Sequence, residues 1–338
     1  MIDRSGFTAR VLINATEMGV ESDDVYLAVL PMFHIAAFLT YAAVARGGTL
    51  VMLPDFSPHA TLEAIERERV TTTCLVPTII SMLTDLPERP DFDLSTLRLI
   101  IYGGSSIEAE SLRRAIAAFG CSFHQQYGMT ETGGQTILRP RDHDPADSQR
   151  LKSAGTEAIS VTVELVDDED RPVPRGAPGE IVCKAPSLMV GYWNRPEATE
   201  EAFRSGWFHT GDIGFRDENG YLHVADRRND MIITGGENVY PREVESLLVE
   251  HPDITEVSVI GVPDERWGQI VTAVVVGDTL PDTAGLSAWL RERLADYKIP
   301  RRWLLAPELP RNATGKVLKH QLRSQYSGEL APKTGHGG

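Results

Sequence analysis

The chain of 338 residues carries 33 lysines and arginines against 48 aspartates and glutamates, which gives a formal net charge of −15. This length suits two or three domains that each bury a core, and the negative charge argues against a nucleic-acid partner, whose phosphates would be repelled. The three cysteines, Cys74, Cys121 and Cys183, lie far apart without a CxxC pair, so we expect no zinc site, no disulfide framework and a cytoplasmic setting.

The first 45 residues contain neither a predicted signal peptide nor a predicted membrane span. Residues 1–10 are polar and lack an apolar core segment, and residues 10–20 are expected to form a short helix. Residues 25–45 carry no charge over a length that could cross a membrane. Pro31 and His34 argue against a span, because a buried strand that runs through the proline into an apolar helix explains the same stretch.

From residue 25 to residue 123 the sequence alternates short apolar runs with amphipathic segments. The pattern predicts an α/β fold with a parallel, doubly wound sheet, because strands covered on both faces are continuous apolar runs. The expected strands are residues 25–30, 48–53, 71–76 and 97–102, and the expected helices include residues 58–69 and 108–119.

Gly103 and Gly104 follow the last of these strands, at a carboxyl end where α/β sheets bind ligands. Because they lack side chains, a flat heterocycle can lie against their backbone. The alternative is a plain glycine turn in which Ser105 or Ser106 caps the next helix.

The segment QQYGMTET, residues 125–132, combines an aromatic ring, hydroxyls and a carboxylate. Tyr127 can stack on a base, and the Thr130 hydroxyl can donate to a phosphate oxygen. Glu131 offers the hard oxygen ligand that nucleotide-bound Mg²⁺ requires. As an isolated string the segment could equally be a polar turn.

A β-rich part is expected after the charged residues 139–152, which we predict to be a flexible surface loop. Residues 153–225 alternate in the manner of strands and predict a small distorted β-barrel. Residues 216–227 read as a hairpin with a polar tip at residues 217–220. Asp212 precedes this hairpin in a turn-rich segment, where its carboxylate can face a pair of sugar hydroxyls or merely solvent.

The last hundred residues predict a compact α+β domain. Its expected elements are a helix over residues 241–250, strands over residues 256–262 and 270–276, a helix over residues 286–295 and a strand over residues 302–305. Lys316 follows a Thr-Gly turn, from which a mobile ammonium could reach an active site, although a solvated lysine is the simpler alternative. Residues 327–338 are expected to be a disordered tail.

Four long motifs occur in order along the chain: HQQYGMTET from His124, GWFHTGD from Gly206, YLHVADRRNDMIITGGENVYPREVE from Tyr221 and PRNATGKVLK from Pro310. Together they resemble the acyl- and aryl-CoA synthetases of the adenylate-forming superfamily, over about residues 24–322. The resemblance implies an enzyme that uses ATP, Mg²⁺ and CoA to convert a fatty or aromatic carboxylic acid, through an acyl-adenylate, into an acyl-CoA.

The resemblance also implies a role for each candidate residue. The nucleotide would be bound by Gly103, Gly104, Tyr127, Asp212 and Arg227, the phosphates and Mg²⁺ by Thr130 and Glu131, the acyl group near His34, and the arm of CoA at Gly235 and Gly236, with Lys316 as the catalytic lysine. Asn229 falls at the hinge between domains, where the family usually has Asp or Lys. Asn still permits the unusual backbone angles of a hinge, but it lacks the charge that would favour one orientation of the two domains.

The family's Ser/Thr/Gly-rich phosphate loop would lie upstream of residue 1, and no GxxxxGK[ST] pattern replaces it. We therefore expect residues 1–142 to be the remnant of a sheet subdomain, 143–226 a β-rich subdomain and 227–326 the C-terminal domain. Adenylation is expected to be impaired in this chain. The alternatives are a non-catalytic nucleotide- or CoA-binding remnant, or half of a split enzyme that needs a separate chain carrying the loop; an amino-acid-activating peptide-synthetase module is a weaker third.

Overall fold

A computed structural model describes residues 1–311 and 317–327 of the chain. The chain forms two compact units. The first consists of Met1–Thr210 with Gly214–Val224, and the second of Gly211–Ile213 with Ala225–Gly338. The three-domain division expected from the sequence stays a prediction. Residues 328–338, assigned to the tail, lie outside the described residues, whereas Ser327 ends a helix.

The first unit is organised around a seven-stranded sheet, which confirms the predicted α/β pattern. Its first five strands in spatial order run parallel, the sixth is antiparallel to the fifth, and the seventh is antiparallel to the sixth. In spatial order the strands are β2 (Thr49–Met52), β1 (Val25–Ala28), β3 (Thr72–Leu75), β4 (Leu99–Gly103), β5 (Ser122–Met129), β6 (Gly133–Leu138) and β7 (Thr156–Glu157).

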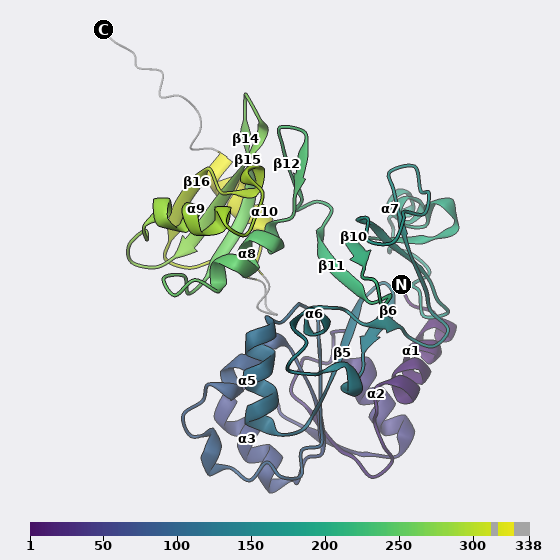
Figure 1. Ribbon diagram of the computed structural model, residues 1–338. Coiled ribbons are helices and arrows are strands. Elements are labelled where there is room, and N and C mark those ends of the chain that lie inside the picture. The colour runs from purple at the N-terminus through teal and green to yellow at the C-terminus, as the bar shows by residue number, and fades with distance from the viewer. Residues whose placement is uncertain (312–316, 328–338) are drawn as a thin grey trace. The chain divides into compact units, whose positions relative to one another are not determined.

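Helices cover both faces of this sheet because successive strand residues point to opposite sides. In β4, Leu99 and Ile101 join the core that α1 and α2 close, whereas Ile100 and Tyr102 join the core under α3, α4 and α5. Figure 1 shows these two groups of helices on opposite sides of the strands. The helices are α1 (Arg4–Glu17), α2 (Ala37–Arg46), α3 (Pro58–Arg67), α4 (Pro77–Thr84) and α5 (Ala109–Phe119).

A side-chain cap explains where α1 begins, whereas α5 begins without one. The side chain of Asp3 accepts a hydrogen bond from the Gly6 amide at 2.7 Å, so α1 starts six residues before the helix expected over residues 10–20. The alternative in which Ser105 or Ser106 caps α5 is wrong, because the N-cap is Glu108 and makes no side-chain cap bond.

A four-stranded sheet takes the place of the predicted β-barrel. Its order is β11-β10-β9-β8, and within the described residues β11 and β8 do not pair to close it. The strands are β8 (Thr162–Val166), β9 (Gly179–Lys184), β10 (Phe208–Arg216) and β11 (Leu222–Arg227), and the short helix α7 (Pro196–Ala202) lies between β9 and β10 in the chain. The predicted hairpin is confirmed, since the Asp217 amide donates to the Tyr221 carbonyl at 3.0 Å across its tip.

Residues 139–152 are more ordered than the predicted surface loop. They contain a 3₁₀ turn over Pro140–Asp142 and the helical turn α6 (Ser148–Leu151). Asp142 and His143 are both only 8% exposed. The prediction was wrong because the charged side chains of this stretch find partners inside the unit, such as the Tyr221 hydroxyl that donates to Asp142 at 2.9 Å.

The second unit is the predicted α+β domain. Its sheet follows the order β13-β12-β15-β14, and β16 pairs with β15 in parallel. The strands are β12 (Ile232–Thr234), β13 (Glu237–Val239), β14 (Val257–Asp264), β15 (Gly268–Val276) and β16 (Arg302–Ala306), and the helices are α8 (Pro241–Val249), α9 (Thr283–Arg291) and α10 (Lys319–Ser327). The sequence did not predict the β12–β13 hairpin.

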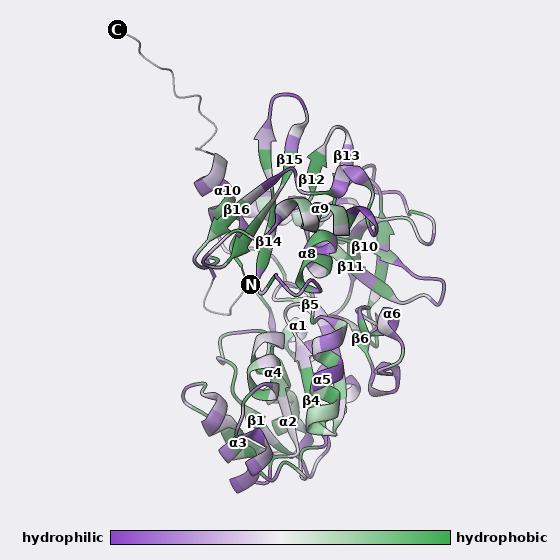
Figure 2. Ribbon diagram, turned by 60° about the vertical axis from the view of Figure 1, so that its left-hand side comes forward, coloured by the Kyte–Doolittle hydropathy of each residue, from purple (hydrophilic) through white to green (hydrophobic). Residues whose placement is uncertain are grey.

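Alternation along the strands again builds two cores. Val271, Ala273 and Val275 of β15 face the core that α8 and α9 close, whereas Val274 packs in the core with α10. Figure 2 shows the neighbouring strand β14, whose residues 257–262 are buried, as mainly hydrophobic. None of the helices within residues 1–311 and 317–327 is long and apolar enough to cross a membrane.

Candidate functional site

The turn after β4 depends on its two glycines for steric reasons. Gly103 pairs with Gln126 of β5, and a Cβ on Gly103 would lie 2.4 Å from the Gln126 carbonyl oxygen. Gly104 has a φ of +82°, a conformation that residues with side chains rarely adopt. The fold itself therefore requires both glycines, and their contact with a nucleotide stays a prediction.

The predicted phosphate segment forms the connection from β5 to β6, beside that glycine turn in the sheet. A Cβ on Gly128 would lie 2.0 Å from the Gly133 carbonyl oxygen, so the two strands approach closely here. Thr132 is fully buried, and its hydroxyl donates to the Gly133 carbonyl at 2.9 Å. Thr130 is exposed, so of the two threonines it is the one whose hydroxyl can meet a ligand.

Glu131 is half-buried, and its carboxylate accepts a hydrogen bond from the Tyr192 hydroxyl at 3.2 Å. Among the described residues no group of three or more His, Cys, Asp or Glu side chains could hold a metal ion by itself. This arrangement fits Mg²⁺, which proteins commonly bind through one or two carboxylates while substrate phosphates and water supply the remaining ligands. Glu131 is the residue that would hold it.

Arg10 of α1 contacts the same turn and was not singled out from the sequence. It is 1% exposed, and it donates to the carbonyl oxygens of Thr130 at 2.7 Å and Glu131 at 3.0 Å. Burial lowers the pKa of its guanidinium to about 10, against an opposing effect of the Glu131 charge. The sequence carried one signal: Arg10 lies four residues from Gly6 and from Asn14, on a single helix face that the fold buries.

His34 lies just before α2, with its ring against Phe33 at a centroid distance of 4.6 Å. Its Nε2 atom is buried and has no hydrogen-bond partner within the part of the chain that the structure describes. A buried polar nitrogen without a partner is uncommon in folded proteins, and a bound molecule could supply one. This observation is compatible with the predicted place of His34 beside the substrate.

Asp212 and Arg227 lie together in the second unit, on the neighbouring strands β10 and β11. The Arg227 Nε atom is 2.7 Å from the Asp212 Oδ1 atom, and the Asp212 side chain is 7% exposed against 39% for Arg227. The sequence assigned both residues to the nucleotide separately. The structure shows that they form an ion pair, so a ligand that reaches Asp212 also meets the Arg227 guanidinium.

Asn229, predicted as the hinge, is an exposed residue in the turn that follows β11. The amides of Asp230 and Met231 both donate to the Arg227 carbonyl, at 2.9 and 3.0 Å. Arg323 of α10 donates to the Asp230 carboxylate at 2.8 Å. These bonds make the turn compact on both sides of Asn229, and its role as a hinge stays a prediction.

Gly235 and Gly236 form the two-residue turn of the β12–β13 hairpin. Their φ values are +61° and +86°, and the strands pair directly across them through Thr234 and Glu237. Two consecutive residues with positive φ are characteristic of the tight turns that join such strands. A Cβ on Gly235 would lie 2.8 Å from Trp267, whereas one on Gly236 would meet nothing within 4 Å. Lys316 lies outside the described residues.

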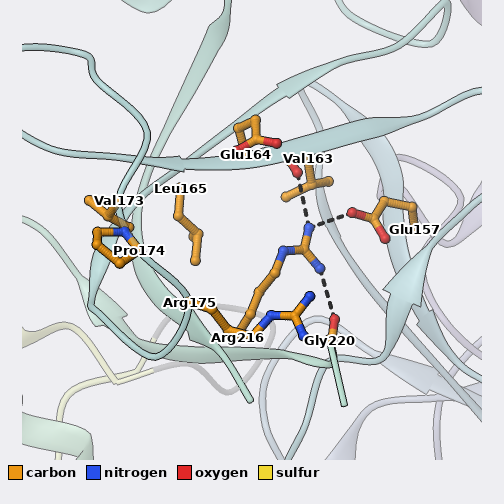
Figure 3. Close-up of a pocket in the computed structure, with 9 residues that line it drawn as sticks. All are labelled: Glu157, Val163, Glu164, Leu165, Val173, Pro174, Arg175, Arg216 and Gly220. Atoms are coloured by element: carbon orange, nitrogen blue, oxygen red, sulfur yellow. Dashed lines mark hydrogen bonds and ion pairs between the residues drawn. The ribbon is translucent and has the colours of Figure 1, made fainter. Parts of the chain in front are cut away.

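A pocket of about 330 Å³ opens in the first unit, and none of the residues predicted for the site lines it (Figure 3). Arg216 projects across it and is held by Glu157, by the Val163 carbonyl at 2.9 Å and by the Gly220 carbonyl at 2.9 Å. The positive charge of Arg216 is therefore already compensated by the Glu157 carboxylate. The lining residues are Glu157, Val163, Glu164, Leu165, Val173, Pro174, Arg175, Arg216 and Gly220.

Comparison with known proteins places this geometry in a family. Residues 5–193 match the AMP-binding enzyme family, and residues 243–316 match the AMP-binding enzyme C-terminal domain. The chain is 40% identical to a feruloyl-CoA synthase of Amycolatopsis sp over 331 residues, covering 96% of this chain and 66% of the relative.

Solved structures of related enzymes have the same fold. The amide bond synthetase McbA from Marinactinospora thermotolerans is 37% identical and matches with a TM-score of 0.89, covering 95% of this chain and 66% of that chain. An O-succinylbenzoate coenzyme A synthetase from Bacillus subtilis, solved with ATP and a magnesium ion, is 34% identical with a TM-score of 0.85, covering 95% and 66%. The chain thus spans slightly less than two thirds of the length of these relatives. Because the family match covers more than half of its residues, this chain belongs to the AMP-binding enzymes.

Proposed function

We propose that this chain carries the nucleotide-, acid- and CoA-binding parts of an acid–CoA ligase. The reaction converts a fatty or aromatic carboxylic acid and Mg²⁺-ATP into an acyl-adenylate and pyrophosphate, and then transfers the acyl group to CoA. The observation that carries the proposal is the turn between β5 and β6, which presents the exposed Thr130 and the half-buried carboxylate of Glu131 next to the Gly103–Gly104 turn. The feruloyl-CoA synthase among the relatives supports an aromatic acid.

Binding and charge stabilisation, without a covalent protein intermediate, account for this chemistry. The acid's carboxylate attacks the α-phosphorus of ATP, and pyrophosphate leaves with the electron pair of the broken P–O bond. Mg²⁺ supplies positive charge to the phosphates when it is bound. In the proposal Thr130 donates to a phosphate oxygen, Asp212 accepts from the ribose hydroxyls, and Arg227 and Lys316 offset the negative charge of the reacting phosphate.

The cysteines do not offer an alternative nucleophile. Burial raises the pKa of Cys74, Cys121 and Cys183 to about 12 in each case. A thiol with such a pKa is protonated at neutral pH and reacts poorly, because the thiolate is the nucleophile. In the proposal the CoA sulfur therefore attacks the acyl carbon itself, AMP leaves with the electron pair of the broken C–O bond, and the thiol proton passes to solvent.

A second candidate is half of a split enzyme, or a remnant that binds nucleotide or CoA without catalysis. It is favoured by one observation: the 338 residues contain neither the family's Ser/Thr/Gly-rich phosphate loop nor a GxxxxGK[ST] pattern in its place. For the same reason we propose that adenylation by these 338 residues alone is impaired; in the split-enzyme alternative, a separate chain carries the loop. The cytoplasmic setting stays a prediction.

Calorimetry with nucleotides tests the proposed binding function. ATP with Mg²⁺ should bind to the folded 338-residue chain detectably but more weakly than to a full-length relative such as the feruloyl-CoA synthase, because the phosphate loop is absent. Absence of any binding heat at millimolar ATP, with or without Mg²⁺, would remove the claim that residues 103–131 form a working nucleotide site.

A further inference from the structure

Polar side chains form a stripe along the buried face of α1, a helix that lies outside the four motifs. Gly6, Arg10 and Asn14 follow one another at intervals of four residues, and all three are buried. Arg10 is 1% and Asn14 is 4% exposed. A guanidinium and an amide are costly to bury, so their partners should explain why they are there.

Arg10 uses its guanidinium to hold the main chain at the turn between β5 and β6. It donates through Nη1 to the Thr130 carbonyl at 2.7 Å and through Nη2 to the Glu131 carbonyl at 3.0 Å. Its Nε donates to the Ser187 carbonyl at 2.8 Å, and the Ser187 hydroxyl in turn donates to the Thr132 carbonyl at 2.6 Å. One side chain therefore holds two consecutive carbonyls of the turn and the buried segment packed against it.

Asn14 extends the same contact to the strand that enters the turn. Its amide donates to the Arg10 carbonyl at 2.9 Å, and its oxygen accepts from the Gln126 amide at 2.9 Å. On the opposite strand a Cβ on Gly134 would lie 2.1 Å from the Gln126 Nε2 atom, so the Gln126 side chain lies over this glycine when it bonds to Asn14. The stripe on α1 is thus hydrogen-bonded to Gln126, before Tyr127, and to Thr130 and Glu131, after it.

We propose that Arg10 is a positioning residue for the Mg²⁺-phosphate contacts of Thr130 and Glu131. The inference rests on the proposed function and adds to it a residue that touches neither metal nor nucleotide. Because Arg10 binds the main chain of both residues, it fixes the backbone positions from which their side chains extend. The exposed Thr130 hydroxyl and the Glu131 carboxylate, which accepts from Tyr192, are then free to meet a ligand in one geometry.

The fork of the guanidinium suits this task better than a lysine does. Three of its donors reach three carbonyls from one planar group, whereas an ammonium on a flexible stem holds no such geometry. A guanidinium is also positively charged in proteins at neutral pH. The hydrogen bonds therefore carry the strength of charged donors.

The test compares variants of the full chain by calorimetry, using ATP in excess Mg²⁺ and ATP in EDTA. The readout is the ratio of the two dissociation constants, because general damage to the fold weakens both and leaves their ratio unchanged. Arg10→Lys and Arg10→Met remove the fork, and Glu131→Gln removes the carboxylate itself. Arg98→Met is the matched control, since Arg98 pairs with the buried Asp24 and donates to the Gly19 carbonyl, at a different place in the same unit.

We expect Mg²⁺ to strengthen ATP binding to the wild-type chain by about tenfold or more, the scale of one charge-assisted contact. Glu131→Gln and both Arg10 variants should bring the ratio to within about threefold of one, with Arg10→Lys less affected than Arg10→Met. Arg98→Met should keep the wild-type ratio even where it lowers the melting temperature.

Other outcomes overturn the inference in distinguishable ways. If folded Arg10 variants keep the wild-type ratio while Glu131→Gln loses it, the proposed function stands and the role of Arg10 is wrong. If both Arg10 variants fail to fold while Arg98→Met folds, Arg10 supports the whole unit and the specific role is equally contradicted. If the wild-type chain shows no dependence on Mg²⁺, the proposed metal contact of Glu131 fails and the inference fails with it.

Discussion

Asp212 and Arg227 are partners across two neighbouring strands, with 2.7 Å between the Asp212 Oδ1 and the Arg227 Nε atoms. The carboxylate is almost fully buried and the guanidinium partly exposed. The pair therefore helps to neutralise the buried carboxylate, while part of the Arg227 side chain remains accessible. A ribose hydroxyl that reaches Asp212 would enter an existing charged pair.

Asp212→Ala should weaken nucleotide binding by about 1–3 kcal/mol, the usual cost of losing a charged hydrogen-bond partner, without unfolding the chain. Arg227→Met should in addition lower the melting temperature, because it removes one charged partner of the buried carboxylate; partial exposure limits this loss to about 1–2 kcal/mol. Calorimetry and thermal unfolding of both variants separate the two effects. If Asp212→Ala lowers stability and leaves nucleotide affinity unchanged, Asp212 is a structural residue and the ribose assignment is wrong.

Two buried histidines should make the first unit sensitive to acid. Burial lowers the pKa of His124 and His143 to about 4, against 6.5 for the free side chain. The unfolded chain thus binds their protons at a higher pH than the folded chain does. Stability is complete above pH 6.5 and is lost as the pH falls from 6.5 to about 4, by on the order of 1–3 kcal/mol per histidine.

The neutral form of His143 is also the form that its neighbours require. The Arg139 carbonyl at 2.9 Å can only accept, so Nδ1 carries the hydrogen, and Nε2 accepts from the Tyr102 hydroxyl at 3.0 Å. Melting temperatures between pH 7 and pH 4 check the prediction. His124→Leu should flatten the dependence, and His59→Gln, at an exposed position, should leave it unchanged. An equally steep loss in His124→Leu would assign the acid sensitivity to other groups.

Gly235 and Gly236 offer a matched pair of substitutions. Gly235→Ala should destabilise the second unit more than Gly236→Ala, because both residues have positive φ but only a Cβ on Gly235 meets Trp267, at 2.8 Å. The strain of positive φ alone costs about 1 kcal/mol or more. Thermal unfolding of the two variants measures the difference, and equal losses would contradict the steric argument.

Gly236 can also be tested for contact with CoA without a steric effect on the fold. Gly236→Asn is a suitable change, since Asn tolerates positive φ and no atom lies within 4 Å of the new Cβ. If the CoA arm passes this turn, the variant should bind ATP as the wild type does and form thioester more slowly, in an assay with supplied acyl-adenylate. An unchanged rate of thioester formation would leave the two glycines with a role in the hairpin alone.

Local patterns made much of the fold predictable. The apolar runs of β1, β3 and β4 and the Gly turn at Gly220 are signals that lie within a few neighbouring residues, and the structure confirms them. The β-barrel was wrong because closure depends on pairing between β8 and β11, which no local pattern specifies. The sequence did not predict the hairpin turn at Gly235 and Gly236, because its strands β12 and β13 are only three residues long and show little alternation.

The same limit holds for the candidate site, because local motifs indicate single residues but not their contacts with distant parts of the chain. The sequence indicated Thr130, Glu131, Asp212 and Arg227 through motifs, but it could not show that the last two form a pair. Arg10 was missed because its partners are main-chain carbonyls more than a hundred residues away, and a carbonyl has no sequence signature. An arginine on the buried stripe of a helix was the one signal that could have prompted a search.

The most direct test of the proposed function separates the two half-reactions. The chain is given CoA with feruloyl-adenylate or dodecanoyl-adenylate, and acyl-CoA is measured; in parallel it is given the free acid with Mg²⁺-ATP, and pyrophosphate is measured. We predict acyl-CoA from at least one adenylate and little or no pyrophosphate, because the groups proposed for the second step are present and the phosphate loop is not. Failure to form acyl-CoA from either adenylate would contradict the proposed ligase function and favour a non-catalytic remnant, whereas robust pyrophosphate release would show that the phosphate loop is dispensable.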